Sequence, residues 1–367
     1  MVALSLPDFP WDSLAAAAAV ARRHEGGIVD LSVGSPVDPT PEVVARALSA
    51  ATDAHAYPQV AGTPALRAAV AEWYERRRGV SGLQDANVLP TIGSKELIAG
   101  MALWLGLGPG DTVVHPVAAY PTYALGAALV GADVLASDDP AEWPESTRLI
   151  WVNSPGNPDG AVLDHEHLRA VVARGRELGA VVAGDECYAE LGWEGEWADR
   201  PTPCILDRRV VGDDLRGVVS VYSLSKQSNL AGYRAGFVAG CDHVIGQLLA
   251  VRKHAGLMPP APVQEAMRAA LGDEAHVREQ KERYRARRAA LAPALGAAGF
   301  RIDHSEAGLY LWATRDEDCW TSVDWFAERG VLVAPGSFYG VDGGRHVRVA
   351  LTTTDERIAA AVERLQG

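Results

Sequence analysis

The sequence contains four lysines, and one of them stands where an amine could act as a nucleophile on a bound ligand. Lys226 follows the apolar run Val218–Tyr222, beside the small hydroxyl residues of Tyr-Ser-Leu-Ser-Lys. A lysine in such a place can form a Schiff base with a carbonyl compound. Two other lysines have simpler explanations: Lys253 is a cation at a helix end, and Lys281 belongs to a charged, solvated helix. Because an isolated loop lysine is usually an ordinary surface residue, the neighbouring segments must support this assignment.

Polar residues after other predicted strands suit an aromatic cofactor. Asp185 ends the apolar segment Val-Val-Ala-Gly-Asp, where a carboxylate could pair with a protonated pyridine nitrogen and keep the ring an electron sink. Tyr188 and Asn157 could both serve an oxygen on that ring. On its own, the segment around Asn157 would be a plain turn rich in Pro, Gly and Asn. Together with Lys226, these residues predict a site for pyridoxal 5′-phosphate (PLP).

A phosphate site is predicted next to a helix start. Gly93 and Ser94 stand between a strand and the helix that Lys95 opens, where exposed N–H groups make an anion site. Arg234, in Gly-Tyr-Arg-Ala-Gly-Phe, and Ser223 could add charge-assisted hydrogen bonds. A glycine turn before a helix is a weak signal by itself, and its coincidence with the other residues gives it weight.

Strands and helices alternate in the part of the chain that carries these residues. Between residues 87 and 239, the runs expected to be strands include Thr112–His115, Leu149–Val152, Val181–Ala183, Val218–Tyr222 and Gly236–Ala239. The expected helices include Glu96–Leu105, His165–Leu178 and Val244–Arg252. This α/β alternation predicts a mostly parallel sheet with helices on both faces and a ligand at the carboxyl ends of the strands.

The pattern changes after the break at Met258–Pro260. A long charged helix, Ala275–Leu291, precedes strands near Leu309–Ala313, Val331–Val333 and His346–Leu351. We therefore predict two domains: a large cofactor-binding domain of residues 31–250, and a smaller α+β domain of residues 1–30 and 251–367. A chain of 367 residues is long enough for both.

Composition excludes several other classes of function. A net charge of −13 argues against nucleic acid as a partner, because phosphate contacts need clustered Lys and Arg. The four cysteines lack C-x-x-C spacing, which predicts neither a disulfide framework nor a zinc site. No metal site is expected at His165 and His167, since residues two apart do not share a helix face and Asp164 suits an N-cap. No apolar run is long enough to cross a membrane, so a soluble, cytoplasmic protein is expected.

The chain resembles the class I and II aminotransferases of PLP fold type I over essentially its whole length. The matching segments occur in the expected order: Gly34–Pro36, Thr40–Pro41, Tyr57, Gly62, Leu66–Arg67, Gly93–Lys95, Pro109–Asp111, Tyr120–Tyr123, Asn153–Gly160, Asp185–Tyr188, Ser223–Lys226, Gly232–Gly236 and Arg348. Each segment alone is weak, but their order is specific. The resemblance implies the aspartate aminotransferase-like fold and PLP as the cofactor. Asp159 stands where the family often has Thr, which leaves Asn157 in place.

The resemblance also implies a role for each matching residue. Lys226 would bind PLP as a Schiff base and carry the substrate proton, and Arg348 would bind the substrate carboxylate, with Gly34 close by. The residues implied for the cofactor are Asp185 at the pyridine nitrogen, Asn157 and Tyr188 at the 3-oxygen, Tyr120 on the ring, and Gly93, Ser94, Ser223 and Arg234 around the phosphate, with Lys95 and Ser225 as further cofactor-binding residues. Tyr57 would reach the phosphate of the neighbouring subunit's cofactor, which implies a homodimer.

Three segments carry a narrower resemblance, to actinobacterial N-succinyldiaminopimelate aminotransferases. They are Leu6–Asp12, Val251–Gly256 and Gly308–Trp312. This resemblance implies transfer between L-glutamate and N-succinyl-2-amino-6-oxopimelate, a step in diaminopimelate and lysine biosynthesis. Distal carboxylates would need a second cation, for which Arg252 and Lys253 are candidates that a helix end explains equally well.

Other functions stay open on the same scaffold. The alternatives are an aminotransferase for aspartate, aromatic or alanine substrates, and a Cβ–S lyase. A PLP-sensing transcriptional regulator is disfavoured, because only about thirty residues precede the matching region and no basic patch is visible. A pseudoenzyme is disfavoured because no expected cofactor contact is missing from the sequence.

Overall fold

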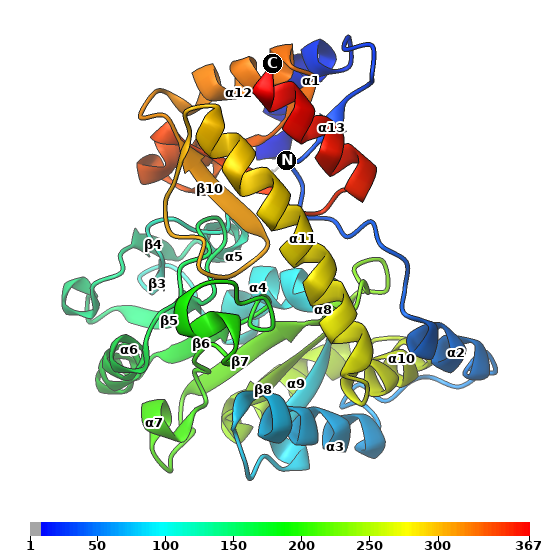
Figure 1. Cartoon of the computed structure of the whole chain (residues 1–367). Coiled ribbons are helices and arrows are strands. Elements are labelled where there is room, and N and C mark those ends of the chain that lie inside the picture. The colour runs from blue at the N-terminus through cyan, green and yellow to red at the C-terminus, as the bar shows by residue number, and fades with distance from the viewer. Residues whose placement is uncertain (1–8) are drawn as a thin grey trace, which may run out of the picture.

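The computed structural model describes residues 9–367 and consists of a large part and a smaller part (Figure 1). A seven-stranded sheet forms the centre of the large part, in the order β2-β8-β7-β6-β5-β3-β4. Its strands are β2 (Val88–Ile92), β3 (Thr112–His115), β4 (Asp133–Ala136), β5 (Thr147–Asn153), β6 (Val181–Asp185), β7 (Val218–Ser223) and β8 (Ala235–Gly240). Only β8 runs antiparallel to its neighbours, so the prediction of a mostly parallel sheet is confirmed.

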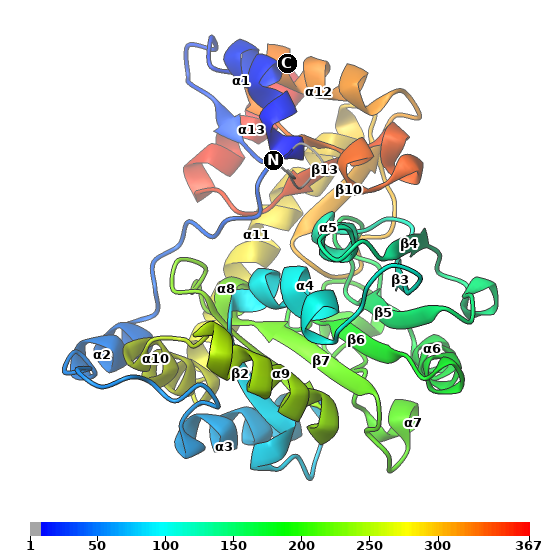
Figure 2. The same cartoon turned by 180° about the vertical axis from the view of Figure 1, so that it is seen from behind.

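Helices cover both faces of this sheet because its strands are apolar on both sides. Along β5, Ile150 and Val152 join the core beneath α3 (Pro64–Trp73), α6 (His165–Leu178) and α7 (Arg208–Val211). Leu149 and Trp151 point the other way, toward α4 (Gly93–Trp104), α5 (Thr122–Ala128) and α9 (Asp242–Ala255). Successive residues of a strand face opposite sides, so near-continuous apolar runs require two covered faces. Figure 2 shows α4 and α9 in front of the sheet.

The smaller part lies beyond the carboxyl ends of the central strands (Figure 1). It contains an antiparallel sheet in the order β12-β13-β10-β9, and β1 pairs with β11. Its strands are β1 (Val29–Asp30), β9 (Arg301–Ile302), β10 (Tyr310–Thr314), β11 (Val331–Leu332), β12 (Ala334–Pro335) and β13 (His346–Ala350). Its helices are α1 (Ala15–Ala21), α11 (Ala275–Ala297), α12 (Cys319–Glu328) and α13 (Asp355–Gln366). Both ends of the described chain lie in this part (Figure 1).

One helix formed by residues assigned to the small domain packs with the large sheet instead. α10 (Ala261–Leu271) lies against α2 (Glu42–Ala50) and α3, and places Val263, Ala266 and Met267 in the large core. The predicted boundary between residues 250 and 251 also falls inside α9. A division after α10 matches the packing better, and the Pro259–Pro260 break, which suggested a boundary, only separates two helices of the same part.

Several smaller predictions can be checked on the described residues. The Asp164 carboxylate accepts a hydrogen bond from the His167 backbone N–H at 2.8 Å and begins α6, as an N-cap does. All four cysteines are free and buried. Over residues 9–367, no group of His, Cys, Asp or Glu side chains is arranged to hold a metal ion, and no helix is long and apolar enough to cross a bilayer. Leu6–Asp8, which carried part of the narrower resemblance, lie outside the described residues.

Candidate active site

A cavity of about 1040 Å³ lies between the two parts, at the carboxyl ends of the central strands. Its walls come from the ends of β5, β6 and β7, the starts of α4 and α5, the segment near Gly34, and β10 and β13. Twelve of the predicted site residues line it: Gly34, Ser94, Lys95, Tyr120, Asn157, Asp185, Tyr188, Ser223, Ser225, Lys226, Arg234 and Arg348. Parallel neighbouring strands end at one edge of a sheet, which is why residues far apart in the sequence converge here.

Lys226 presents its amine at the centre of this cavity. It belongs to the single-turn helix α8 (Leu224–Gln227), which begins directly after β7 and is capped by the Ser223 hydroxyl. Its Nζ donates a hydrogen bond to the backbone oxygen of Gly34. Burial lowers the pKa of the Lys226 amine below its ordinary value, and the positive charges of Arg348 and Arg234 add to this effect. A lowered pKa favours the neutral amine, which is the form that attacks carbonyl carbon or accepts a proton.

Asp185 lies buried at the end of β6, the strand next to β7. One carboxylate oxygen accepts a hydrogen bond from the Tyr123 hydroxyl at 2.8 Å, and the other accepts one from the Cys187 N–H at 3.2 Å. Burial raises the pKa of Asp185 above its ordinary value, although these hydrogen bonds oppose the rise. A carboxylate held by neutral donors in an apolar setting would be stabilised by a cationic ligand group, such as a protonated pyridine nitrogen.

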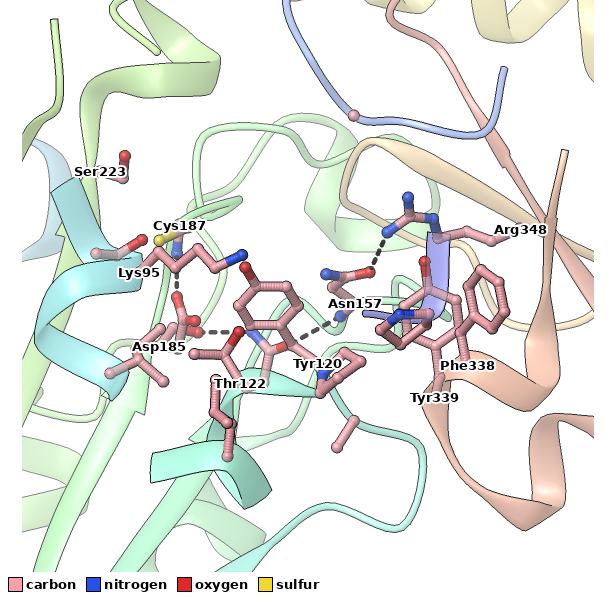
Figure 3. Close-up of a pocket in the computed structure, with 18 of the residues that line it drawn as sticks. Lys95, Tyr120, Thr122, Asn157, Asp185, Cys187, Ser223, Phe338, Tyr339 and Arg348 are labelled. Atoms are coloured by element: carbon pink, nitrogen blue, oxygen red, sulfur yellow. Dashed lines mark hydrogen bonds between the residues drawn. The ribbon is translucent and has the colours of Figure 1, made fainter. Parts of the chain in front are cut away.

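Arg348 is fixed in the opposite wall, on β13. Its Nη1 donates to Asn157 Oδ1 at 2.8 Å (Figure 3). Its Nη2 donates to the backbone oxygen of Ser32, also at 2.8 Å. The guanidinium carbon lies 3.9 Å from the ring centre of Tyr310. The bond to Arg348 occupies the oxygen of the Asn157 amide, so the NH2 group of that amide is the end that can donate to a ligand. A buried guanidinium facing a cavity is suited to bind a carboxylate with two hydrogen bonds.

The glycine turn before α4 brings backbone N–H groups close to a guanidinium. Gly93 has a φ of +69°, and a Cβ at this position would collide with the Arg234 side chain. The Ser223 hydroxyl donates to the Ser225 hydroxyl at 2.8 Å on the facing helix start. Helix N–H groups, hydroxyl groups and a guanidinium together are suited to a phosphate monoester. Glycine suits this position because it adopts the positive φ readily and leaves room for the Arg234 guanidinium.

Three predictions about cations need correction. The expectation that Arg252 or Lys253 binds a distal carboxylate is wrong for this structure, since neither lines the cavity. Arg252 is 0% exposed, donates to Glu96 Oε1 at 2.7 Å and packs over Trp104. The Lys281 side chain is half-buried against Trp193 instead of fully solvated. In α9 and α11 the local sequence could not show which distant side chain packs against these cations.

The buried Arg252–Glu96 pair anchors the start of α4, because Glu96 Oε2 also accepts the Ile92 N–H at 3.2 Å. Replacing Arg252 by Met should lower the free energy of unfolding of the cofactor-free protein by about 2–3 kcal/mol, since it leaves the Glu96 carboxylate without its cation. Glu96 retains 22% exposure, which places the loss below that of a fully buried pair. Urea unfolding measures it.

Lys253→Met is the matched control. This neighbour on the same helix is exposed, so its replacement should change stability by no more than about 0.5 kcal/mol. Equal losses in the two variants would contradict the anchoring role of Arg252.

Several residues that shape the cavity were given no role from the sequence. Asn153 links two predicted residues, because its Nδ2 donates to the Asp185 backbone oxygen at 2.9 Å and its Oδ1 accepts the Asn157 N–H at 2.8 Å. Tyr123 was seen only as part of a Tyr-Pro motif, although a phenol one helical turn after Tyr120 could have been a candidate. The cavity residues Trp11, Tyr310, Phe338 and Tyr339 come from the smaller part, and no local signal relates them to the large sheet.

A lysine amine and a carboxylate at the ends of adjacent parallel strands, with a phosphate-type anion site beside them, define the architecture of a PLP enzyme of fold type I. The family model for class I and II aminotransferases matches residues 27–365, and the chain belongs to this family. Members of the family are PLP-dependent enzymes, as the sequence resemblance implied. The donor groups described above fit that cofactor in charge and chemistry.

Similar proteins extend over nearly the whole chain. A probable aminotransferase of Mycobacterium tuberculosis is 56% identical over 365 residues, covering 99% of this chain and 86% of the relative. The 4-dedimethylamino-4-oxo-anhydrotetracycline transaminase OxyQ of Streptomyces rimosus is 53% identical, covering 98% of this chain and 99% of the relative. Among solved structures, a probable N-succinyldiaminopimelate aminotransferase of Thermus thermophilus has a TM-score of 0.86 and 30% identity, covering 98% and 99% of the two chains.

Proposed function

We propose that this aminotransferase moves the amino group of L-glutamate to N-succinyl-2-amino-6-oxopimelate, a long keto acid with carboxylates at a distance from its carbonyl group. The observation that carries the proposal is a further cation in the cavity, in addition to those proposed for the cofactor and the α-carboxylate. Besides Lys226, Arg234 and Arg348, the cavity is lined by Lys95 at the start of α4. The likeness to a probable N-succinyldiaminopimelate aminotransferase over 98% of the chain supports the same substrate.

The proposed roles of the site residues follow from their positions. PLP, when bound, withdraws electrons from the substrate Cα and makes its proton removable. The Lys226 amine would hold the cofactor covalently and, once released from it, would take the proton from the substrate Cα and pass it on as a general acid. Asp185 would keep the pyridine nitrogen protonated, and Asn157 and Tyr188 would donate to the 3-oxygen. Arg348 fixes the α-carboxylate, which orients the Cα proton toward the Lys226 amine.

Lys95 is suited to a distal carboxylate because it is an exposed amine on the cavity wall. Its Nζ lies 5.9 Å from the centre of the Tyr120 ring (Figure 3). It lies 5.6 Å from the centre of the Phe9 ring. These aromatic rings hold the amine by cation–π attraction without neutralising its charge. The family resemblance implies that Lys95 binds the cofactor, so the experiment must separate cofactor binding from substrate binding.

Replacing Lys95 by Met should raise the KM for the succinylated acceptor about tenfold, the effect of losing one exposed charge-assisted hydrogen bond. The KM for pyruvate, which has no distal carboxylate, should stay unchanged. Steady-state kinetics with both acceptors, beside a titration of the cofactor affinity, makes the comparison. Equal changes for both acceptors, or a loss of PLP affinity alone, would assign Lys95 to the phosphate instead.

A second candidate acceptor is favoured by the apolar part of the cavity. Trp11, Ile98, Leu125, Val134 and Phe338 line it, and these side chains suit a bulky ring system better than a flexible dicarboxylate. The similarity to the anhydrotetracycline transaminase OxyQ supports this alternative. A panel of acceptors with L-glutamate as donor separates the two. Formation of 2-oxoglutarate without ammonia indicates transfer, whereas ammonia with pyruvate from a Cβ–S substrate indicates a lyase.

We also propose that the active enzyme is a cytoplasmic homodimer in which Tyr57 of one subunit reaches the cofactor phosphate of the other. In the single chain Tyr57 is 97% exposed and does not line the cavity, which supports a role across an interface. Leu103 on α4, 61% exposed, is a second large apolar side chain that an interface would cover.

A mixing experiment tests this arrangement. Tyr57→Phe should weaken PLP binding, and Lys226→Ala should be inactive. A mixed dimer of the two variants contains one site with both native residues. Activity should therefore reappear when the two are unfolded and refolded together, with the cofactor affinity of the parent enzyme. If the refolded mixture is no more active than the Tyr57→Phe protein alone, the two subunits do not share residues of one site.

A further inference from the structure

Tyr310 places a phenol at the heart of the cavity, although the sequence gave this residue no role. It lies on β10 with only 4% exposure, and its hydroxyl oxygen is 3.2 Å from that of Tyr188. The two rings meet edge to face at 71°, and the Arg348 guanidinium covers the Tyr310 ring. Tyr310 therefore joins two residues with proposed roles in catalysis, one on each side of the cavity.

The local backbone leaves room for this hydroxyl group. A Cβ at residue 34 would collide with the Tyr310 hydroxyl oxygen, so only glycine fits there. The Gly34 carbonyl in turn accepts the hydrogen bond from the Lys226 amine. The Tyr310 hydroxyl and the Lys226 amine thus both lie next to Gly34.

The charges around the two phenols favour Tyr310 as the donor in their hydrogen bond. Burial raises the pKa of Tyr188 well above its ordinary value. Burial acts on Tyr310 as well, but the positive charges of Arg348 and Lys226 outweigh it and hold the pKa of Tyr310 below its ordinary value. The more acidic phenol is the better donor, and the less acidic one is the better acceptor. A phenol has a single O–H, so if the Tyr188 O–H points to the cofactor, Tyr188 can take part in the 3.2 Å contact only as the acceptor, with Tyr310 as the donor.

We propose that Tyr310 is a positioning residue that donates a hydrogen bond to the Tyr188 oxygen and thereby directs the Tyr188 O–H toward the cofactor's 3-oxygen. The inference rests on the proposed placement of Tyr188 against that oxygen. Hydrogen bonds in a chain polarise one another, so donation from Tyr310 strengthens donation from Tyr188. A more strongly held negative charge on the 3-oxygen weakens its attraction for the proton on the linked Lys226 nitrogen. Tyr310 thus lowers the pH at which that nitrogen loses its proton.

The test is the pH dependence of the visible absorbance of the PLP-loaded protein. Tyr310→Phe removes one oxygen atom and should raise the midpoint pH by about half a unit to one unit, the equivalent of one ordinary hydrogen bond. Tyr188→Phe should raise it further, and the double variant should match Tyr188→Phe, because Tyr310 acts only through Tyr188. Tyr339→Phe is the control: this phenol is also buried in the cavity wall beside Arg348, and its removal should leave the midpoint unchanged.

Three outcomes overturn the proposal. If Tyr188→Phe shifts the midpoint and Tyr310→Phe does not, Tyr310 has no part in the hydrogen-bond chain while the proposed placement of Tyr188 stands. If the shifts of the single variants add in the double variant, Tyr310 acts independently of Tyr188. A Tyr188→Phe protein with an unshifted midpoint removes the placement of Tyr188 and this inference with it. Should Tyr310→Phe fail to fold, Gly34→Ala displaces the same hydroxyl group and should raise the midpoint in the same direction.

Discussion

Replacing Lys226 by alanine should reduce kcat for transfer from L-glutamate by a factor on the order of 10³ or more, the greatest loss expected from any single substitution. Loss of a positioned general base alone costs roughly 10²–10⁴-fold, and loss of the covalent link to the cofactor adds to it. The variant should fold normally, since the Lys226 side chain is only half-buried and its one hydrogen bond goes to the Gly34 backbone. Single-turnover kinetics on PLP-loaded protein measures the chemical step without product release.

Lys253→Ala is the matched control for this variant. It removes an exposed lysine outside the cavity and should keep the kcat of the parent enzyme. A Lys226→Ala protein that keeps more than about a tenth of the parent kcat would show that another group carries the proton.

Asp185→Asn should have the second-largest effect, and should change activity and stability in opposite directions. Without a carboxylate beside it, the pyridine nitrogen would not stay protonated, and kcat should fall by a factor on the order of 10²–10³. Burial holds the pKa of Asp185 above its ordinary value, so the folded chain retains this proton to higher pH than the unfolded chain. The stability that the carboxyl contributes is therefore lost as pH rises through that interval, and the cofactor-free variant should be more stable than the parent at neutral pH.

Thermal unfolding of the cofactor-free proteins checks the sign of this effect. The Tm advantage of Asp185→Asn should grow between about pH 4 and about pH 7. Asp207 provides the opposite case, because hydrogen bonds from Arg209 outweigh burial and hold its pKa below the ordinary value. Asp207→Asn should therefore lower Tm at neutral pH, and its effect should shrink as acid protonates the parent carboxyl group. A destabilised Asp185→Asn protein would contradict the description of Asp185 as a carboxylate awaiting a cation.

The site residues of the large sheet could be predicted because each stands at or just after the end of a strand, and each strand can be recognised from its own apolar sequence. Lys226, Asp185 and Asn157 come after β7, β6 and β5, and these three strands are neighbours in the sheet. Parallel strands all end at one edge, so the order of elements was enough to bring the three side chains together. The helix start at Gly93 could be predicted for a similar reason, since a glycine and a serine between a strand and a helix are visible in the sequence itself.

Residues whose roles depend on distant packing could not be predicted in this way. Arg252 has the pattern of a helix-end cation, and its partner Glu96 is 156 residues away. Tyr310 begins the continuous apolar run of β10, so in the sequence it looks like an ordinary core aromatic residue. Its place in the cavity becomes visible only when the two parts of the structure are seen together. The Pro259–Pro260 break indicated a domain boundary, but burial of Val263 and Met267 keeps α10 with the large part. In each case a contact between remote elements decided the outcome.

The most direct test of the central claim is the visible absorbance of the purified protein with PLP, recorded before and after addition of L-glutamate. Lys226 linked to PLP should give a yellow band that L-glutamate removes as its amino group passes to the cofactor, with release of 2-oxoglutarate. The Lys226→Ala protein should lack this band. A protein that binds no PLP, or whose spectrum no amino acid changes, would contradict the account.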